Sequence, residues 1–399
     1  MQIAERLRNT APSATVQMAR IAREMRAAGR EITDMAEGES DFDTPAHIVA
    51  AAHEAARRGE TRYTDVAGTL PLREAVAEKF RRDNGLAVGA AQVVVGTGAK
   101  QLIFNAMMAT LNPGDEVVIP TPSWVSYPDI VRLCGGVPVL LPCTADSGFK
   151  LAPAALAKVI GPRTRWLILN SPGNPTGAVL SKAELLALAD VLRAHPQVGV
   201  LCDDIYETIR FAEGPFATMA QVAPDLAHRV LTVSGLSKSH AMTGWRIGFA
   251  AGPEELISAM VKLQGQQTTN SASVCQAAAL AALTGPQDFL PGWLAAYRRR
   301  RDMAAGALAG AKGLRLALPE GAFYLFPACD AYLGRHMPEG RQITSDGELA
   351  AWLLEAAGVA LVPGTAFGAP GHLRLCFARS DETVQRGATR VAEALERLV

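Results

Sequence analysis

A lysine and an arginine lie eight residues apart in a segment that favours anion binding. Residues 234–248 read SGLSKSHAMTGWRIG and follow the apolar run VLTV, which predicts a short buried strand. Lys238 is therefore expected just beyond the carboxyl end of a strand, where open α/β sheets bind ligands. Arg246 needs an anion as partner, and glycines and hydroxyl groups such as Ser237 surround both cations. Each charge alone is more often an ordinary surface charge, but together they indicate a lysine beside a phosphate site.

Two further segments place an amide, acids and a phenol at the ends of predicted strands. NSPGNPTG follows the run WLILN, and a tight turn explains its prolines and glycines but leaves Asn174 without a reason. An amide there can donate a hydrogen bond to a ligand. The run VGVLC ends in Asp203 and Asp204, with Tyr206 close behind. Buried acids need a cationic partner, although either acid could instead cap the following turn.

Two anion-binding features lie outside these segments. GTGAK at 96–100 follows a predicted strand and opens a predicted helix, so Gly98 and Ala99 offer backbone N–H groups to an anion. This loop matches neither the dinucleotide nor the triphosphate fingerprint, so it is a weak signal by itself. In LRLCFA, Arg374 alternates with apolar residues and points away from their face. Its planar fork matches a carboxylate, and an exposed place on an edge strand is the alternative.

The motifs, taken in order, resemble one known family. GESDF, GTGAKQ, NSPGNPTG, DDIY, SGLSK, GWRIG and LRLCFA are similar to motifs of the class I aminotransferases, the aspartate aminotransferase-like enzymes of fold type I that use pyridoxal 5'-phosphate. The resemblance spans most of the chain. It implies that Lys238 forms an imine with the cofactor and, once an amino acid has displaced it, moves the α proton.

The resemblance also implies the remaining roles. Asp203 would contact the ring nitrogen, Tyr206 and Asn174 the ring oxygen, and Trp124, which by itself is more often a core residue, would stack on the ring. The expected cofactor contacts at the phosphate end are Gly98, Ala99, Lys100, Ser237, Arg246 and Tyr63. The expected substrate contacts are Gly38, Lys100, Trp124, Asn174 and Arg374. The Asn174 to Pro175 bond is expected to be cis.

A homodimer with shared active sites is the expected active unit. The resemblance implies that Tyr63, and Thr268 as well, would reach the phosphate of the neighbouring subunit. Four departures from the family pattern are Ser40, Gly173, Asp204 and Gly235. Gly235 replaces a hydroxyl residue, so it puts one side-chain contact to the phosphate in doubt.

The substrates are expected to be amino acids and 2-oxo acids. Lys100, with Ser13 and Thr15, resembles the bacterial branch that accepts dicarboxylic amino acids, so aspartate and glutamate come first, with 2-oxoglutarate or oxaloacetate as acceptor. A solvated lysine at a helix start is the alternative for Lys100. Aromatic amino acids or prephenate come next, and a carbon-sulfur lyase of the same fold would use the same residues. A transcription regulator on this fold would need an appended DNA-binding domain, and the first motif begins near residue 36.

The composition excludes several partners. Lys plus Arg equals Asp plus Glu at 39 each in 399 residues, so no net charge attracts nucleic acid or an anionic membrane. Seven histidines show no zinc spacing, and no metal is expected. The six cysteines contain no C-x-x-C pair and are expected to be buried reduced thiols, which suits the cytoplasm. No apolar run approaches the length of a membrane helix, and the four arginines at 298–301 indicate a solvated or interface helix.

The order of the predicted elements gives the fold class. The expected strands of the first part are VVVG, EVVIP, VPVLLP, WLILN, VGVLC, VLTV and GFAA, with helices between many of them. This alternation predicts an α/β large domain over 46–289, with a mainly parallel seven-stranded sheet flanked by helices. A smaller α+β domain is expected from 1–45 and 290–399, with strands LRLAL, AFYLF, VALVP and LRLCFA. Helices are expected near 16–28, 47–58, 72–83, 182–194 and 346–357, with a closing helix to residue 398.

Overall fold

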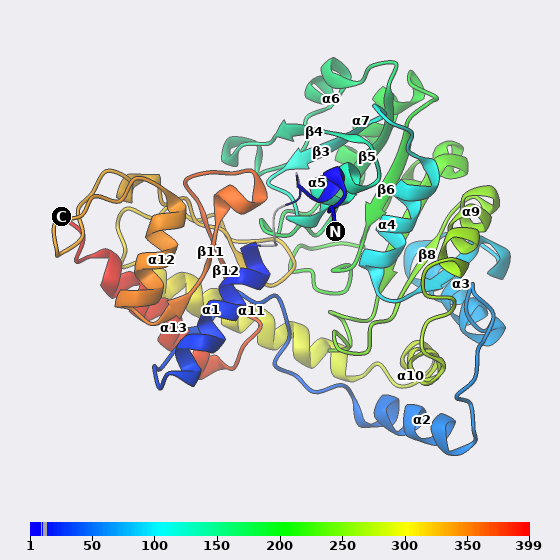
Figure 1. Cartoon of the computed structure of the whole chain (residues 1–399), viewed down its shortest axis with the longest axis horizontal. Helices are drawn as coiled ribbons and strands as arrows, with labels where there is room; N and C mark the ends of the chain where they lie inside the picture. Colours follow the sequence, from blue (N-terminus) through cyan, green and yellow to red (C-terminus); the bar gives the residue numbers. More distant parts are fainter. Residues whose placement is uncertain (9, 11–13) are drawn as a thin grey trace.

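The computed structural model describes residues 1–8, 10 and 14–399. Its centre is a seven-stranded sheet in the order β2-β8-β7-β6-β5-β3-β4 (Figure 1). Only β8 runs antiparallel to its neighbours, so the predicted mainly parallel α/β sheet is confirmed. The strands are β2 (Val93–Gly96), β3 (Glu116–Thr121), β4 (Val137–Pro142), β5 (Thr164–Asn170), β6 (Gly199–Asp203), β7 (Val230–Gly235) and β8 (Gly248–Ala251).

Helices cover both faces of this sheet because successive strand side chains point to opposite sides. In β5, Ile168 packs with the core beneath α4, α5 and α9, whereas Leu167 and Leu169 pack with the core beneath α6 and α7. The helices around the sheet are α2 (Ala46–Arg57), α3 (Leu70–Asn84), α4 (Ala99–Thr110), α5 (Ser126–Leu133), α6 (Pro153–Val159), α7 (Lys182–Arg193), α8 (Met219–Val222), α9 (Glu254–Gly265) and α10 (Ser273–Thr284). Ser181 and Glu184 form a capping box at the start of α7.

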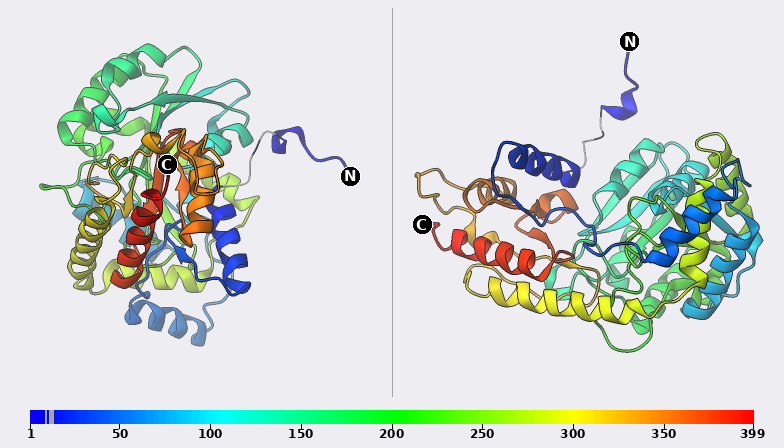
Figure 2. Two further views of the ribbon diagram at one scale, coloured as in Figure 1. Left: turned by 90° about the vertical axis from the view of Figure 1, so that its left-hand side faces the viewer. Right: turned by 90° about the horizontal axis from the view of Figure 1, so that it is seen from below.

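Two small sheets and four helices form the other part of the chain. A pair of parallel strands joins β1 (Thr33–Asp34) to β10 (Val359–Ala360), and an antiparallel sheet has the order β11 (Val362–Pro363), β12 (Leu373–Cys376) and β9 (Tyr324–Leu325). The helices are α1 (Ala14–Ala27), α11 (Phe289–Leu308), α12 (Asp346–Ala356) and α13 (Asp381–Leu395). Figure 2 shows α11 running beneath both parts of the chain. The division into 46–289 and 1–45 plus 290–399 stays a prediction.

The structure corrects two strand predictions in this part. LRLAL forms no strand: Arg315 makes a single antiparallel bridge with Ala328, where the preceding Pro327 has no N–H to extend a ladder. Leu318 is 54% exposed, so no buried face holds the run in place. VALVP, expected as one strand, divides at Leu361 between two different sheets.

Two other expectations about single residues are refined. Five cysteines are buried, whereas Cys275 is half-buried, and all six are free thiols. Among the arginines at 298–301, Arg300 is 5% exposed and forms ion pairs with Asp41 and Asp381, which makes α11 an interface helix within the chain. No helix in the described part of the chain is both long enough and apolar enough to span a bilayer.

Candidate active site

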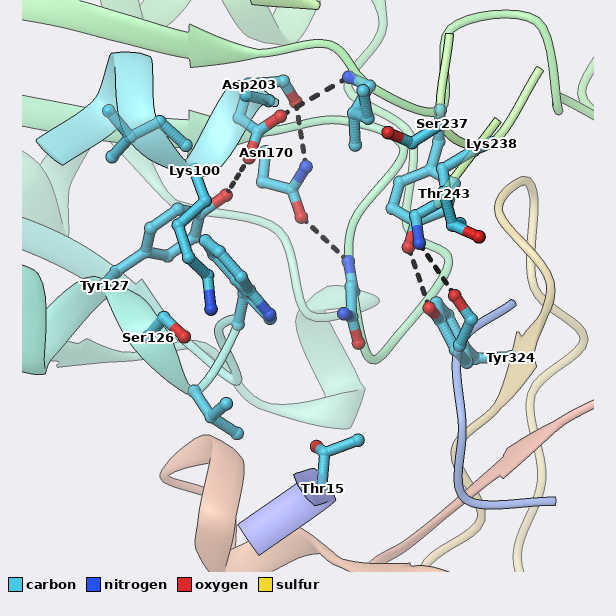
Figure 3. Close-up of a pocket in the computed structure, with 18 of the residues that line it drawn as sticks. Thr15, Lys100, Ser126, Tyr127, Asn170, Asp203, Ser237, Lys238, Thr243 and Tyr324 are labelled. Carbon is cyan, nitrogen blue, oxygen red and sulfur yellow. Dashed lines mark hydrogen bonds between the residues drawn. The ribbon is translucent and has the colours of Figure 1, made fainter. Parts of the chain in front are cut away.

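The carboxyl ends of the central strands bring most of the predicted residues to one cavity of about 270 Å³ (Figure 3). Asn170 at the end of β5 is paired in register with Asp203 at the end of β6, which is paired with Val233 in β7. Lys238 follows β7 by three residues, so the chain must deliver it to the same edge. Lys238 and Asp203 both line the cavity, as do residues of α1, α4, α5, β9 and β12.

The amine of Lys238 is held against the N-terminal segment. Its Nζ donates a hydrogen bond to the carbonyl of Gly38 at 2.7 Å. Burial of the amine is the main reason why the pKa of Lys238 falls to about 8, and the cations of Arg374 and Arg246 lower it further. The side chain therefore supplies a neutral amine at a pH where an exposed lysine is charged. Gly38 lies where expected, but here its carbonyl contacts Lys238, and the predicted N–H contact to substrate is untested.

Asp203 is a buried acid with one strong donor. The hydroxyl of Tyr127 donates to its Oδ2 at 2.6 Å, and the amide of Ile205 approaches Oδ1 at 3.4 Å. Burial raises the pKa of Asp203 to about 6, although Tyr127, the Ile205 amide and Lys238 oppose the rise. A cation placed against Oδ1 would stabilise the ionised form. The sequence offered only one signal for Tyr127, which is its place three residues after Trp124.

Asn174 links the strand ends to a buried arginine. Its backbone N–H donates to Asn170 Oδ1 at 2.8 Å, and Asn170 Nδ2 donates to the carbonyl of Asp203 at 2.8 Å. Asn174 Oδ1 then accepts from Arg374 Nη1 at 2.9 Å. The Asn174–Pro175 bond is cis, as expected. Asn170 is a positioning residue that our sequence analysis quoted without assigning it a role.

Arg374 is a buried cation without an acid beside it. It is 2% exposed and lies on the central strand β12, so the alternative of an exposed edge position is wrong. Its Nη2 donates to the carbonyl of Ala36, its Nε has no hydrogen-bond partner, and it forms no salt bridge with any described residue. A buried guanidinium is costly unless an anion accompanies it, so this geometry favours an anionic ligand.

Tyr206 lies beside a second tyrosine that sequence reasoning missed. The hydroxyls of Tyr206 and Tyr324 are 2.7 Å apart, and both side chains are buried. Burial is the main reason why the pKa of Tyr206 is raised well above its usual value and that of Tyr324 to about 12. Both phenols therefore keep their protons. Only the alternation of AFYLF marks Tyr324 in the sequence, and alternation does not say which face meets the cavity.

The predicted phosphate end lies at the start of α4. Gly98 has φ of 83°, and a Cβ on it would lie 2.6 Å from Arg246 Nη2, so a side chain there would displace the guanidinium. Arg246 Nη1 donates to the carbonyl of Thr243 at 2.8 Å, and Ser237 and Ala99 line the same end. The first N–H groups of a helix have no partner within it and suit an anion.

The departure at Gly235 has a local explanation. A Cβ there would lie 3.2 Å from both Gly248 Cα and Ile205 Cδ1, because β7 and β8 pack closely at this point. Glycine fits this position better than a residue with a hydroxyl group.

The outer wall of the cavity carries Trp124 and Lys100. Lys100 Nζ lies 4.7 Å from the centre of the Trp124 ring, a cation–π distance. Burial and the charge of Arg246 lower the pKa of Lys100. Thr15 from α1 also lines the cavity, whereas Ser13 lies outside the described residues.

Two predicted residues are not brought into the cavity of a single chain. Tyr63 is 87% exposed and does not line the cavity. Thr268 is exposed, and its hydroxyl accepts a hydrogen bond from Gln101 Nε2 at 2.8 Å beside the first turn of α4.

The charges around the cavity fit an anionic ligand with a cationic ring nitrogen. Among the residues that the structure describes, four basic side chains line the cavity against one acid, Asp203; they are Lys100, Lys238, Arg246 and Arg374. The unpartnered Nε of Arg374 and the Gly98 turn beside Arg246 each suit an anion, and Asp203 lines the same cavity with Oδ1 weakly bonded. The cavity can therefore hold the phosphate, carboxylate and aromatic groups of one cofactor and one substrate at the same time.

Known proteins match this chain over nearly its full length. A model of the family described as aminotransferase class I and II matches residues 30–391. A probable aspartate/prephenate aminotransferase from Rhizobium leguminosarum bv. phaseoli is 49% identical over 98% of this chain and 97% of its own length. The crystal structure of the aspartate aminotransferase from Rhizobium meliloti has a TM-score of 0.97 and 48% identity, and covers 100% of both chains. That of an aspartate aminotransferase from Thermus thermophilus with maleate has a TM-score of 0.91 and 41% identity, and covers 99% of this chain and 100% of its own.

Proposed function

Because the chain belongs to the aminotransferase class I and II family and is a transaminase, we propose that it uses pyridoxal 5'-phosphate on Lys238 to move the amino group of aspartate or glutamate to a 2-oxo acid. The observation that carries this proposal is the pairing of a buried, acid-free Arg374 with the low-pKa amine of Lys238 in one cavity. An α-amino acid offers a carboxylate to the first and an α proton to the second.

The cofactor, when bound, supplies an electron-accepting ring that stabilises the negative charge left when a substrate carbon loses its proton. Asp203 supports this with a carboxylate that would pair with the protonated ring nitrogen. Pairing with a cation lowers an acid's pKa, so it would offset the burial that now raises the pKa of Asp203 to about 6. Tyr206 and Asn174 would donate to the ring oxygen, and Trp124 would stack on the ring face.

Lys238 would act as the base. In the cofactor-free chain the pKa of its amine is about 8, so about half of the amines are neutral at that pH and can accept a proton from a substrate α carbon. The carbonyl of Gly38 accepts from Nζ at 2.7 Å and gives the amine a fixed resting position. The same Nζ can then return the proton to the carbon that receives the amino group.

Arg374 would orient the substrate. Asn174 Oδ1 and the carbonyl of Ala36 each accept one N–H of the guanidinium, so the fork is fixed before the substrate arrives. A carboxylate held on such a fork has one orientation, which aims the α C–H bond at Lys238 and favours proton loss over decarboxylation. Burial excludes water and strengthens this contact.

Lys100 is proposed to meet the distal carboxylate of a dicarboxylic substrate. It extends over Trp124 at the outer wall of the cavity, and Thr15 lies on the same wall. The relative with maleate, a dicarboxylate, and the relatives named for aspartate support this choice. The printed name of one relative adds prephenate, so aromatic amino acids and prephenate remain the second class of substrate.

A panel of amino donors against 2-oxoglutarate tests these assignments. We expect aspartate to give glutamate with the wild-type chain and no turnover with Lys238→Ala. Lys100→Ala should lower kcat/KM for aspartate by about 10-fold to 100-fold, the value of one charged contact, and leave phenylalanine nearly unchanged. A dicarboxylate preference that survives Lys100→Ala contradicts the role of Lys100, and turnover by Lys238→Ala contradicts the function itself.

We also propose a homodimer in the cytoplasm. The exposed Tyr63 ring, and the exposed Arg246 and Thr268 at the phosphate end, suit a site that a second subunit completes. Six free thiols suit a reducing compartment. Mixing Tyr63→Phe and Lys238→Ala chains should restore part of the activity if sites are shared, and sedimentation would give the size of the assembly.

A further inference from the structure

Tyr324 contacts three groups of the proposed reaction at once. Tyr324 is 1% exposed and lies on β9. It is paired in register with Cys376 of β12, which follows Arg374 by two residues. Its hydroxyl is 2.7 Å from the hydroxyl of Tyr206. The sheet of the smaller part of the chain thus delivers one phenol to the edge of the larger sheet.

The ring of Tyr324 holds the guanidinium of Arg374. The Cζ atom of Arg374 lies 4.5 Å from the centre of the Tyr324 ring and 4.9 Å from that of Phe367. Two aromatic rings at cation–π distance restrict a planar cation in a way that its two hydrogen bonds alone do not. The contact depends on the ring and not on the hydroxyl.

The hydroxyl of Tyr324 lies against the backbone that holds Lys238. A Cβ added to Gly38 would overlap this hydroxyl and would lie 3.1 Å from Tyr324 Cζ. Gly38 is the residue whose carbonyl accepts from Lys238 Nζ. The phenol therefore fills the space that a side chain at position 38 would need.

We propose that Tyr324 is a positioning residue with two separable parts, a hydroxyl that sets the donor direction of Tyr206 and a ring that orients Arg374. This rests on the proposed function, since it assumes that Tyr206 donates to the cofactor ring oxygen. A phenol has one proton. If Tyr206 donates to the ring oxygen, the 2.7 Å contact requires Tyr324 to donate to Tyr206.

Hydrogen bonds in such a chain polarise one another. A proton donated by Tyr324 makes the Tyr206 hydroxyl a stronger donor, which stabilises an anionic ring oxygen. Burial keeps both phenols protonated, because it is the main reason why the pKa of each is raised. Removing the Tyr324 hydroxyl should therefore favour the protonated form of the bound pyridoxal 5'-phosphate, which is the chromophore of the loaded protein.

The two parts are tested with Tyr324→Phe and Tyr324→Leu in the holoenzyme. Tyr324→Phe should raise the pKa of the bound chromophore by about 0.5 unit, a fraction of one hydrogen bond. It should lower kcat by about 3-fold and leave KM for aspartate within about 2-fold, since the ring remains. Tyr324→Leu should raise KM for aspartate and glutamate by about 5-fold to 30-fold through loss of the cation–π contact.

A double variant and a matched control separate positioning from stability. Tyr206→Phe and Tyr206→Phe/Tyr324→Phe should have the same kcat and chromophore pKa if the hydroxyl acts through Tyr206. Tyr332→Phe is the control, because Tyr332 is also buried, accepts from the Gly313 N–H at 3.0 Å and does not line the cavity. Its chromophore pKa and KM should equal those of the wild type. Equilibrium dialysis with pyridoxal 5'-phosphate and thermal unfolding show whether each variant is folded and loaded.

Three results would overturn the proposal: a Tyr324→Phe chain with wild-type kcat and chromophore pKa, a KM rise as large in Tyr324→Phe as in Tyr324→Leu, or additive effects in the double variant. A wild-type chain that binds the cofactor but transfers no amino group would instead refute the proposed function, so the two failures are distinct.

Discussion

Replacing Asp203 by Asn should stabilise the cofactor-free chain while abolishing catalysis. Burial raises the pKa of this acid from 3.8 to about 6, so the folded state disfavours its ionised form. An acid whose pKa is higher in the folded chain than in the unfolded chain stabilises the fold only while it is protonated. This contribution is complete below the unfolded pKa and is lost as the pH rises through the folded pKa. The shift of about 2 units corresponds to a cost of about 3 kcal/mol when the acid is fully ionised. An amide has no charge to bury, and its oxygen can still accept from Tyr127.

The pH dependence gives the sharper signature. The wild-type penalty should be about 1.5 kcal/mol at about pH 5 and about 3 kcal/mol at about pH 8, so the advantage of Asp203→Asn should roughly double over this range. Urea unfolding of the cofactor-free chains would measure it, with coincident fluorescence and circular dichroism transitions as the condition for a free energy. Asp146→Asn, at an exposed acid, is the control and should change little.

Adding the cofactor should reduce the stability advantage of Asp203→Asn over the wild type. Asp203 then gains a cationic partner, so the wild type should be stabilised more by the cofactor than Asp203→Asn is. A variant no more stable than the wild type at about pH 8, or equally stabilised at about pH 5 and about pH 8, would refute the argument that a buried, ionisable Asp203 awaits a cation.

Four further outcomes are expected. In the cofactor-free chain, Lys238 should react with an amine reagent with a midpoint near pH 8, whereas exposed lysines need a higher pH, as peptide mapping would show. Arg374→Lys should raise KM by about 30-fold to 1000-fold for every α-amino acid, whatever its side chain, because a lysine cannot make the two-pronged contact of a guanidinium to the α-carboxylate. Steady-state kinetics would measure this rise. Gly98→Ala should weaken cofactor affinity by about 10-fold or more in equilibrium dialysis. An alanine is strained at φ of 83°, and its Cβ would displace the guanidinium of Arg246. Arg300→Ala should destabilise the chain by about 1.5–3 kcal/mol in urea, because Asp41 and Asp381 lose charged hydrogen bonds to the buried guanidinium.

Much of the site was predictable because its residues belong to short local motifs. Lys238, Asp203 and Arg374 each follow or lie within an apolar run, and period and turn residues alone place them on strands or just past strand ends. The seven-stranded sheet was expected in the same way, whereas the cis Asn174–Pro175 bond was expected from the family resemblance. Local patterns also misled: LRLAL has the composition of a strand, but no neighbouring strand continues its ladder.

The residues that sequence reasoning missed contact partners far away in the chain. Tyr127 donates to Asp203 across 76 positions, and Tyr324 meets Tyr206 across 118. The residues next to either tyrosine do not indicate its partner, because each contact forms only when strands and helices from separate parts of the chain pack together. Asn170 is a milder case, since the register between β5 and β6 decides that it lies beside Asp203.

The sequence by itself determined which groups are available: one lysine after a strand, one acid at a strand end, and arginines for two anions. Only the tertiary structure decided their chemical state. Burial lowers the pKa of Lys238 and raises that of Asp203, and it leaves Arg374 without an acid. Burial depends on how all the packed elements exclude water, so it is a property of the folded chain and not of any segment within it.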